Sequence, residues 1–172
     1  MKLKIGLSLL GSLAVVVALG LTVKTKTQWE RNNRIQQAFP PPVNLALDNS
    51  EKFYLYSLQQ ERLTDADLKT MPNFYGYPIA GQVCVRPKPE RADLMAALRG
   101  DLGKRTDCSC FAPAYGVRVV RRHKKVDLMI SFACEQMEVW DDRGMHRISV
   151  SAKAQEVFNH ILAEYDVPLP GH

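Results

Sequence analysis

The sequence lacks the short motifs that mark the common catalytic and nucleotide-binding sites. It contains no glycine-rich phosphate loop, no Gly-x-Ser-x-Gly nucleophile elbow and no His-Glu-x-x-His zinc helix. The four histidines have no spacing typical of a metal site or of a catalytic base. Internal repeats and low-complexity tracts are also missing, so the 172 residues are expected to form one globular domain with an appendage.

Excess charge of either sign is missing from most of the chain. Residues 1–34 hold six basic side chains and one acidic side chain, which accounts for the whole formal net charge of +5. Residues 35–172 hold 17 side chains of each sign. Because a nucleic-acid-binding protein needs a basic face that displaces counterions, we predict no binding to nucleic acid. No cofactor is predicted either.

The excess positive charge flanks the long hydrophobic run IGLSLLGSLAVVVALGLTV, residues 5–23, which holds 19 uncharged residues. A helix rising about 1.5 Å per residue would span about 28 Å here, close to the roughly 30 Å of a bilayer core. The run therefore predicts a single-pass transmembrane signal-anchor, and a signal peptide cleaved after Gly20 is the alternative. The short charged N-terminus is expected to stay in the cytosol, which would make the domain extracytoplasmic.

The chain is expected to divide into three parts, and the prolines mark the start of the globular domain. Residues 1–23 form the predicted membrane anchor or signal segment. Residues 24–43 read as a polar stalk that ends in a stiff proline-rich linker at Pro40, Pro41 and Pro42. Residues 44–172 are expected to form the globular domain.

Periodicity in residues 44–172 predicts an α+β domain. An antiparallel sheet of about five strands is expected, with two main helices packed on it. Strands are expected near residues 52–58, 79–85, 117–121, 126–139 and 146–151. The apolar phase slips near residues 135–136, which predicts a bulge there. The helices are expected over residues 89–102 and 152–165.

Four cysteines are present, two of them in the unusual stretch CSCFAPAYG, residues 108–116. In an exported domain an even number of cysteines favours disulfides. The hairpin that follows Cys110 should return to the same end at Cys134, so we predict a Cys110–Cys134 disulfide beside a Cys84–Cys108 disulfide. Four cysteines allow three connectivities. A four-cysteine zinc site, unpaired thiols and a cysteine nucleophile are the alternatives.

The segments CFAPAYGVRVV and VDLMISFAC resemble a group of uncharacterised bacterial proteins, small and exported or membrane-anchored. Members carry a CF-x-P-x-x-G segment followed by an apolar strand that ends in cysteine. The resemblance covers roughly residues 52–168 and implies a bacterial envelope location, with no assigned activity. This chain departs from the group at Ala114-Tyr115, where an Arg-His pair is expected, and at Ser131, where a further cysteine is common.

The basic run RRHKK is expected to be a solvated hairpin turn, and a surface patch that contacts anionic headgroups is the functional alternative. Its residues are Arg121, Arg122, His123, Lys124 and Lys125.

Two functions are consistent with these features. The first is a membrane-tethered extracytoplasmic domain that binds an unknown protein or envelope component without catalysis. The second is a thiol-dependent or zinc-assisted enzyme centred on Cys108 and Cys110.

Overall fold

A computed structural model of the chain describes residues 27–100, 102 and 110–171. The chain divides into two compact units, Met1–Gln37 and Ala38–His172. In the first unit the described residues are helical, and the Gln28 side-chain amide donates a hydrogen bond of 3.2 Å to Asn32 one turn later.

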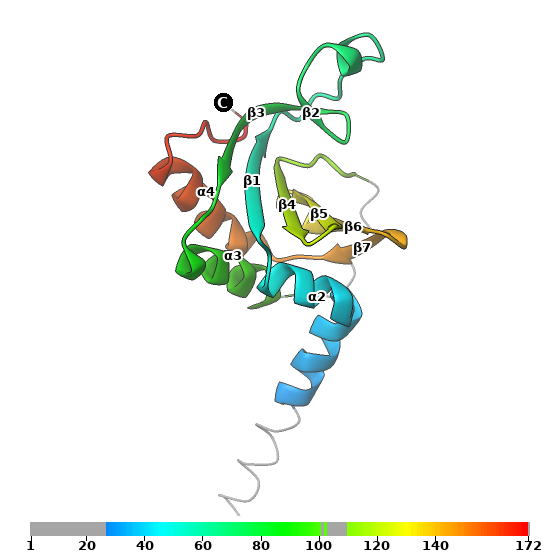
Figure 1. The fold of residues 1–172 in the computed structure, drawn as a ribbon, viewed down its shortest axis with the longest axis vertical. Coiled ribbons are helices and arrows are strands. Elements are labelled where there is room, and N and C mark those ends of the chain that lie inside the picture. The colour runs from blue at the N-terminus through cyan, green and yellow to red at the C-terminus, as the bar shows by residue number, and fades with distance from the viewer. Residues whose placement is uncertain (1–26, 101, 103–109, 172) are drawn as a thin grey trace, which may run out of the picture. The chain divides into compact units, whose positions relative to one another are not determined.

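A seven-stranded antiparallel sheet forms the body of the second unit, with the strand order β2-β3-β1-β4-β5-β6-β7 (Figure 1). The strands are β1 (Lys52–Leu58), β2 (Asn73–Phe74), β3 (Tyr77–Cys84), β4 (Tyr115–Arg121), β5 (Lys124–Ser131), β6 (Gln136–Asp141) and β7 (Gly144–Ser149). From β4 to β7 every connection is a hairpin, so neighbours in sequence are neighbours in the sheet.

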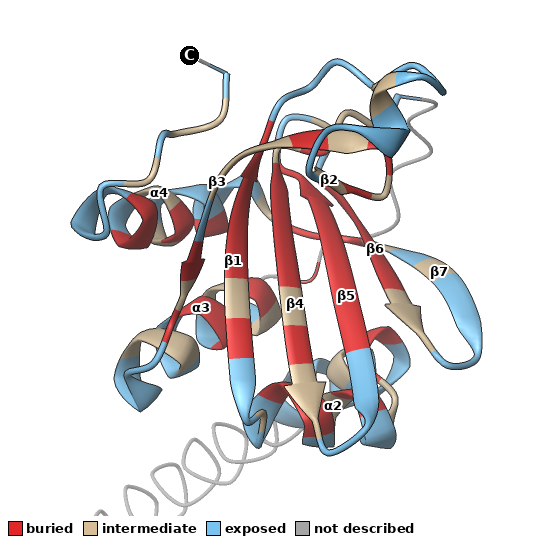
Figure 2. Cartoon of the chain, turned by 45° about the horizontal axis from the view of Figure 1, so that its top comes forward, coloured by how far each residue is buried: buried red, intermediate tan, exposed pale blue. Residues whose placement is uncertain are grey.

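Three α-helices cover one face of this sheet, as Figure 2 shows. They are α2 (Pro41–Asp48), α3 (Lys88–Gly100) and α4 (Gln155–Glu164), with short 3-10 turns η1 (Asp67–Lys69) and η2 (Ala152–Ala154). Alternate residues of each strand face the helices, and on the central strands these residues are fully buried. Leu55, Val117, Leu128 and Val139 form one such row across four strands.

The expectation of about five strands and two main helices is wrong, because the sheet has seven strands and three α-helices cover it. The phase slip near residues 135–136 is a hairpin turn and not a bulge. The chain reverses after Ser131, Glu135 N–H donates to the Phe132 carbonyl at 3.2 Å, and Glu135 takes a positive φ of 49°. One expected long strand is therefore the pair β5 and β6. The additional strand is the two-residue β2.

The prolines expected to form a stiff spacer instead begin α2. Pro40 is the extended N-cap residue with φ −52° and ψ 154°, and Pro41 opens the helix. The first helical positions need no intrahelical N–H donor, so proline is tolerated there and its fixed φ favours the helix. The compact unit accordingly begins at Ala38, with Phe39 already fully buried, and not near residue 44.

The prediction of a transmembrane helix is corrected as well. Within residues 27–100, 102 and 110–171, no helix is both long and apolar enough to cross a membrane. The predicted segment itself, residues 5–23, lies outside the described residues.

Candidate functional site

No helix of the described chain lies over the second face of the sheet, which we call the open face. Its core is a cluster of Tyr56, Leu58, Phe74 and Met129. Half-buried rings, Phe111 among them, pack around this cluster. The open face thus has a buried apolar floor ringed by partly accessible aromatic side chains, whereas the opposite face is covered by helices.

A tight hairpin between β2 and β3 places several of these rings. Phe74 pairs with Tyr77, so Tyr75 and Gly76 form a two-residue loop. Both loop residues have positive φ, 53° and 88°, as the type I′ turns favoured in hairpins require. The hairpin packs the Phe74 ring at 4.8 Å from the Tyr56 ring and turns Tyr75 toward the strands.

Gly116 of β4 leaves the space that Phe74 fills. A Cβ atom on this residue would lie 2.9 Å from Cδ1 and Cε1 of the Phe74 ring, closer than packed carbon atoms approach. The glycine is therefore a packing requirement of the open face.

Asp127 anchors the open face electrostatically. Its carboxylate is completely buried and accepts two hydrogen bonds of 2.8 Å from the Arg118 guanidinium. The Tyr75 hydroxyl donates to the same carboxylate at 2.9 Å, and Lys125 Nζ lies 3.3 Å away. The fork of two parallel bonds is the strongest geometry an arginine and a carboxylate can adopt.

The contacts with Asp127 raise the pKa values of two of its neighbours. The pKa of Tyr75 is raised, first by burial and then by its hydrogen bond to Asp127. The pKa of Arg118 is also raised, chiefly by its hydrogen bonds to Asp127. Tyr75 is consequently held neutral with its ring fixed against Trp140, the two centroids lying 4.7 Å apart.

Beside this network lies a surface cleft of about 360 Å³, which we call the aromatic cleft. Four half-buried rings and two methionines provide its apolar lining: Tyr75, Tyr77, Phe111, Trp140, Met129 and Met145. Three charged side chains complete it: Arg62, Glu138 and Arg147. Such a mainly apolar hollow with a few polar groups is typical of a small-ligand site.

The charges of the aromatic cleft are not all compensated. Glu138 is 5% exposed and is bonded by Arg147 Nη2 at 2.5 Å and Trp140 Nε1 at 3.3 Å. The Arg147 guanidinium stacks 4.9 Å above the Phe111 ring. Arg62 stacks 5.9 Å above the Tyr77 ring and has no acidic partner among the described residues. Among the described residues, the cleft therefore carries one positive charge at its rim without an acidic partner.

A second hollow, of about 520 Å³, lies between α2 and α3. Its arginines already have partners: Arg99 donates to Asp48 and Asn44, and Arg91 donates to the Val85 and Ser50 carbonyls. These side chains tie the two helices together, so we regard this hollow as a packing feature.

The structure brings together two of the four cysteines that were predicted to form disulfides. Cys110 Sγ and Cys134 Sγ lie 2.9 Å apart, at the end of the β4–β5 hairpin away from its turn. Cys84 lies at the end of β3 and has no sulfur partner among the described residues, while Cys108 falls outside them. The disulfides stay predictions. Groups of three or more metal-ligating side chains are absent from the described residues.

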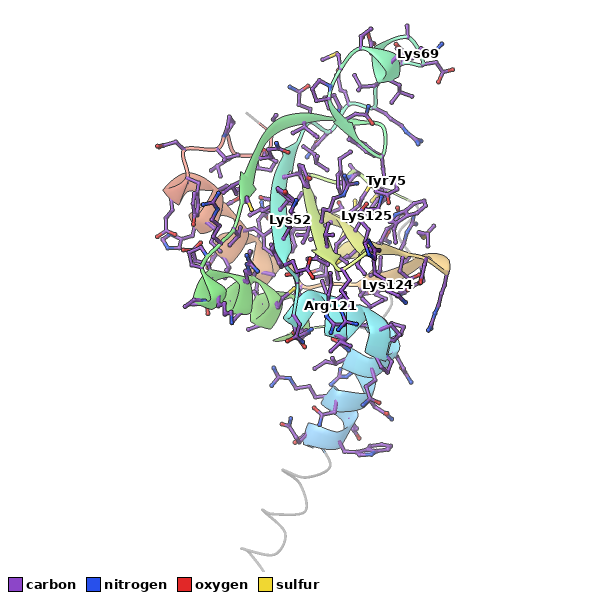
Figure 3. All side chains as sticks on the ribbon, in the orientation of Figure 1. Lys52, Lys69, Tyr75, Arg121, Lys124 and Lys125 are labelled. Atoms are coloured by element: carbon purple, nitrogen blue, oxygen red, sulfur yellow. The ribbon has the colours of Figure 1, made fainter. Side chains whose placement is uncertain are left out.

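The basic run lies at the opposite end of the sheet from the β2–β3 hairpin. Figure 3 shows Arg121 and Lys124 near α2, and Lys69 at the far end. Arg122 and His123 form the turn between β4 and β5. The run is partly neutralised, since Lys124 pairs with Asp142 at 3.3 Å and Lys125 approaches Asp127.

Comparison of the chain with protein-family models, curated proteins and solved structures gives no significant match. The resemblance through the CF-x-P-x-x-G segment therefore stays a prediction.

Sequence reasoning missed the residues of the aromatic cleft. Arg62, Tyr75, Trp140 and Arg147 are spread over 86 positions of the chain and share no motif. One local signal was present in the stretch NFYGYP. Its Tyr-Gly pair stands between two short strands, as the loop of a two-residue hairpin does.

Proposed function

We propose that this domain is a non-catalytic binding module and that the aromatic cleft is its binding site. One observation carries the proposal: on the sheet face that no helix of the described chain covers, half-buried rings surround a cleft together with Arg62, which has no acidic partner among the described residues. A ligand that stacks on partly exposed rings and pairs with a neighbouring guanidinium makes contacts that water cannot replace.

A rigid scaffold supports this role. One wall of the cleft is built on the neighbouring strands β5, β6 and β7, and Tyr75 of the β2–β3 loop is fixed by its bond to buried Asp127. Side chains held by packing and by hydrogen bonds lose little freedom on binding, which favours affinity.

Methyl NMR on protein labelled with [methyl-13C]methionine tests the proposal. The six methionines include two in the cleft, Met129 and Met145, one in the hollow between α2 and α3, Met95, and one on an exposed loop, Met71. A fragment library should shift the Met129 and Met145 signals selectively. Hits that shift Met95 or Met71 instead would contradict the assignment of the site.

Thiol counting addresses the enzymatic alternative centred on Cys108 and Cys110. Protein purified without reductant is titrated with a thiol reagent first folded and then denatured, and bound zinc is measured in parallel. Stoichiometric zinc, or fast-reacting thiols in the folded protein, would favour the enzyme.

A further inference from the structure

We infer that the ligand of the aromatic cleft is a small planar organic anion whose carboxylate binds Arg62 and whose rings lie against Trp140 and Met145. The inference rests on the proposed function, because it names the ligand of the same site. Size, shape and charge of the cleft each support it.

The volume of the cleft sets the size of the ligand. About 360 Å³ lies at the low end of the range of roughly 300–1,000 Å³ found for small-molecule sites. A body of one or two rings fits this space, and a longer chain does not.

The lining favours a flat apolar body. Tyr75 and Trp140 pack together with ring planes 31° apart, so their outer surfaces offer a broad aromatic wall. Met145, 46% exposed, pairs with Trp140 across the β6–β7 hairpin and supplies a flexible, polarisable contact beside it. Rings stack well on such surfaces.

Arg62 supplies the anion-binding group, and the chain fixes its place. The neighbouring Leu63 N–H donates to the Gly76 carbonyl at 2.9 Å, which ties this segment to the β2–β3 hairpin. The Arg62 guanidinium then stacks on the ring of Tyr77, the residue after that glycine. A stacked guanidinium keeps its edge free to donate two parallel bonds to a carboxylate.

A cationic ligand is the other chemistry that rings and a carboxylate suggest, as in aromatic cages for ammonium groups. The carboxylate here is already engaged, since Glu138 is buried against Arg147 and Trp140. With Arg147 paired to Glu138, the guanidinium of Arg62 gives the described lining a net positive charge, which would repel a cation. The charge of the cleft therefore selects an anion.

Titrations of the full chain with three probes test the inference by the same methionine methyl signals. The probes are 2-naphthoate, 2-naphthylmethylammonium and acetate. We expect 2-naphthoate to shift Met129 and Met145 in a saturable way, and at least tenfold weaker binding of the other two.

Arg62→Met should weaken 2-naphthoate binding by about tenfold or more, because it removes a charged donor pair. Arg122→Met is the matched control: Arg122 is also exposed but lies in the β4–β5 turn, and its variant should bind as the wild type does. Unchanged Met95 shifts in both variants would show intact folds.

The outcomes separate the two claims. Stronger binding of the ammonium probe at Met129 and Met145, or equal affinity of wild type and Arg62→Met, would overturn the anion inference and leave the binding site standing. Probes that bind only near Met95 or Met71 would overturn both.

Discussion

Asp127 is the residue on which the open face depends. Its carboxylate is completely buried and holds the guanidinium of Arg118, the hydroxyl of Tyr75 and the ammonium of Lys125 near one point. Loss of the buried carboxylate leaves the half-buried guanidinium of Arg118 and hydroxyl of Tyr75 without their charged acceptor, which costs more than an exposed pair contributes.

Asp127→Asn should therefore lower the free energy of unfolding by about 3 kcal/mol in urea denaturation. Asp142→Asn is the matched control, since its pair with Lys124 is solvent-exposed and should contribute less than about 1 kcal/mol. Equal losses in the two variants would show that the Asp127 network is not a stabilising centre.

Tyr75 should give the stability a dependence on alkaline pH. Its folded-state pKa is raised above the ordinary value of 10.0 by burial and by Asp127. The folded protein keeps the phenol proton where the unfolded chain loses it, so the contribution is complete below pH 10 and is lost as the pH rises through the folded-state pKa. Urea unfolding should show a smaller advantage of wild type over Tyr75→Phe at pH 11 than at pH 8. A constant difference would refute the raised pKa.

Gly116→Ala should destabilise the protein, because the new Cβ would meet the Phe74 ring at 2.9 Å. We expect a loss of roughly 1–3 kcal/mol, as for other overpacked cores. Gly100→Ala is the control, since nothing lies within 4 Å of the added Cβ at that position. The control should unfold at the wild-type urea concentration or slightly above it. A Gly116→Ala variant as stable as Gly100→Ala would refute the close packing of Phe74.

At the scale of elements, the sequence predicts regular strands well and their boundaries less well. The aromatic run at residues 52–58 coincides with β1, and the stripe that follows Pro89 lies in α3. Period-two alternation and a proline near the helix start are local signals, so local reasoning finds them.

Two elements escaped prediction for physical reasons. The β5–β6 turn contains no glycine or proline, and its positive φ falls on Glu135, so no breaker residue marks it. Helix α2 begins within three consecutive prolines, and only burial of Val43, Ala46 and Leu47 against the domain gives this short segment its helical stability.

The predicted Cys110–Cys134 disulfide belongs to this scale, because it would tie the segment before β4 to the β5–β6 turn. Ala114 N–H donates to the Ile130 carbonyl, which aligns the two segments four residues from each cysteine. Oxidation by a low-molecular-weight disulfide would convert the two thiols into one disulfide and release two reduced thiols. The disulfide would close a loop in which its two cysteines lie 24 positions apart. Closing such a loop adds about 3 kcal/mol to the free energy of unfolding by the chain-entropy estimate.

Peptide mapping under non-reducing conditions checks the connectivity. The expected result is a cross-linked peptide pair that contains Cys110 and Cys134. A pair that joins Cys108 to either residue would contradict the assignment.

At the scale of the whole molecule, the two faces of one sheet serve different ends. The face under α2, α3 and α4 buries a core of aliphatic and aromatic side chains and holds the fold together (Figure 2). The open face carries rings and charges that remain partly accessible. Strand alternation predicts that two faces exist, but distant residues such as Arg62 and Arg147 meet only through the folded topology. The balanced charge of residues 35–172 predicts no binding to nucleic acid, and this stays a prediction.

Contacts between 2-naphthoate and methionine methyl groups, measured as intermolecular nuclear Overhauser effects in the full chain, test the central claim most directly. Binding in the aromatic cleft predicts cross-peaks from the naphthalene protons to the methyls of Met145 and Met129, two residues that line this cleft. Cross-peaks to Met95 in the hollow between α2 and α3, with none to Met145, would contradict the account.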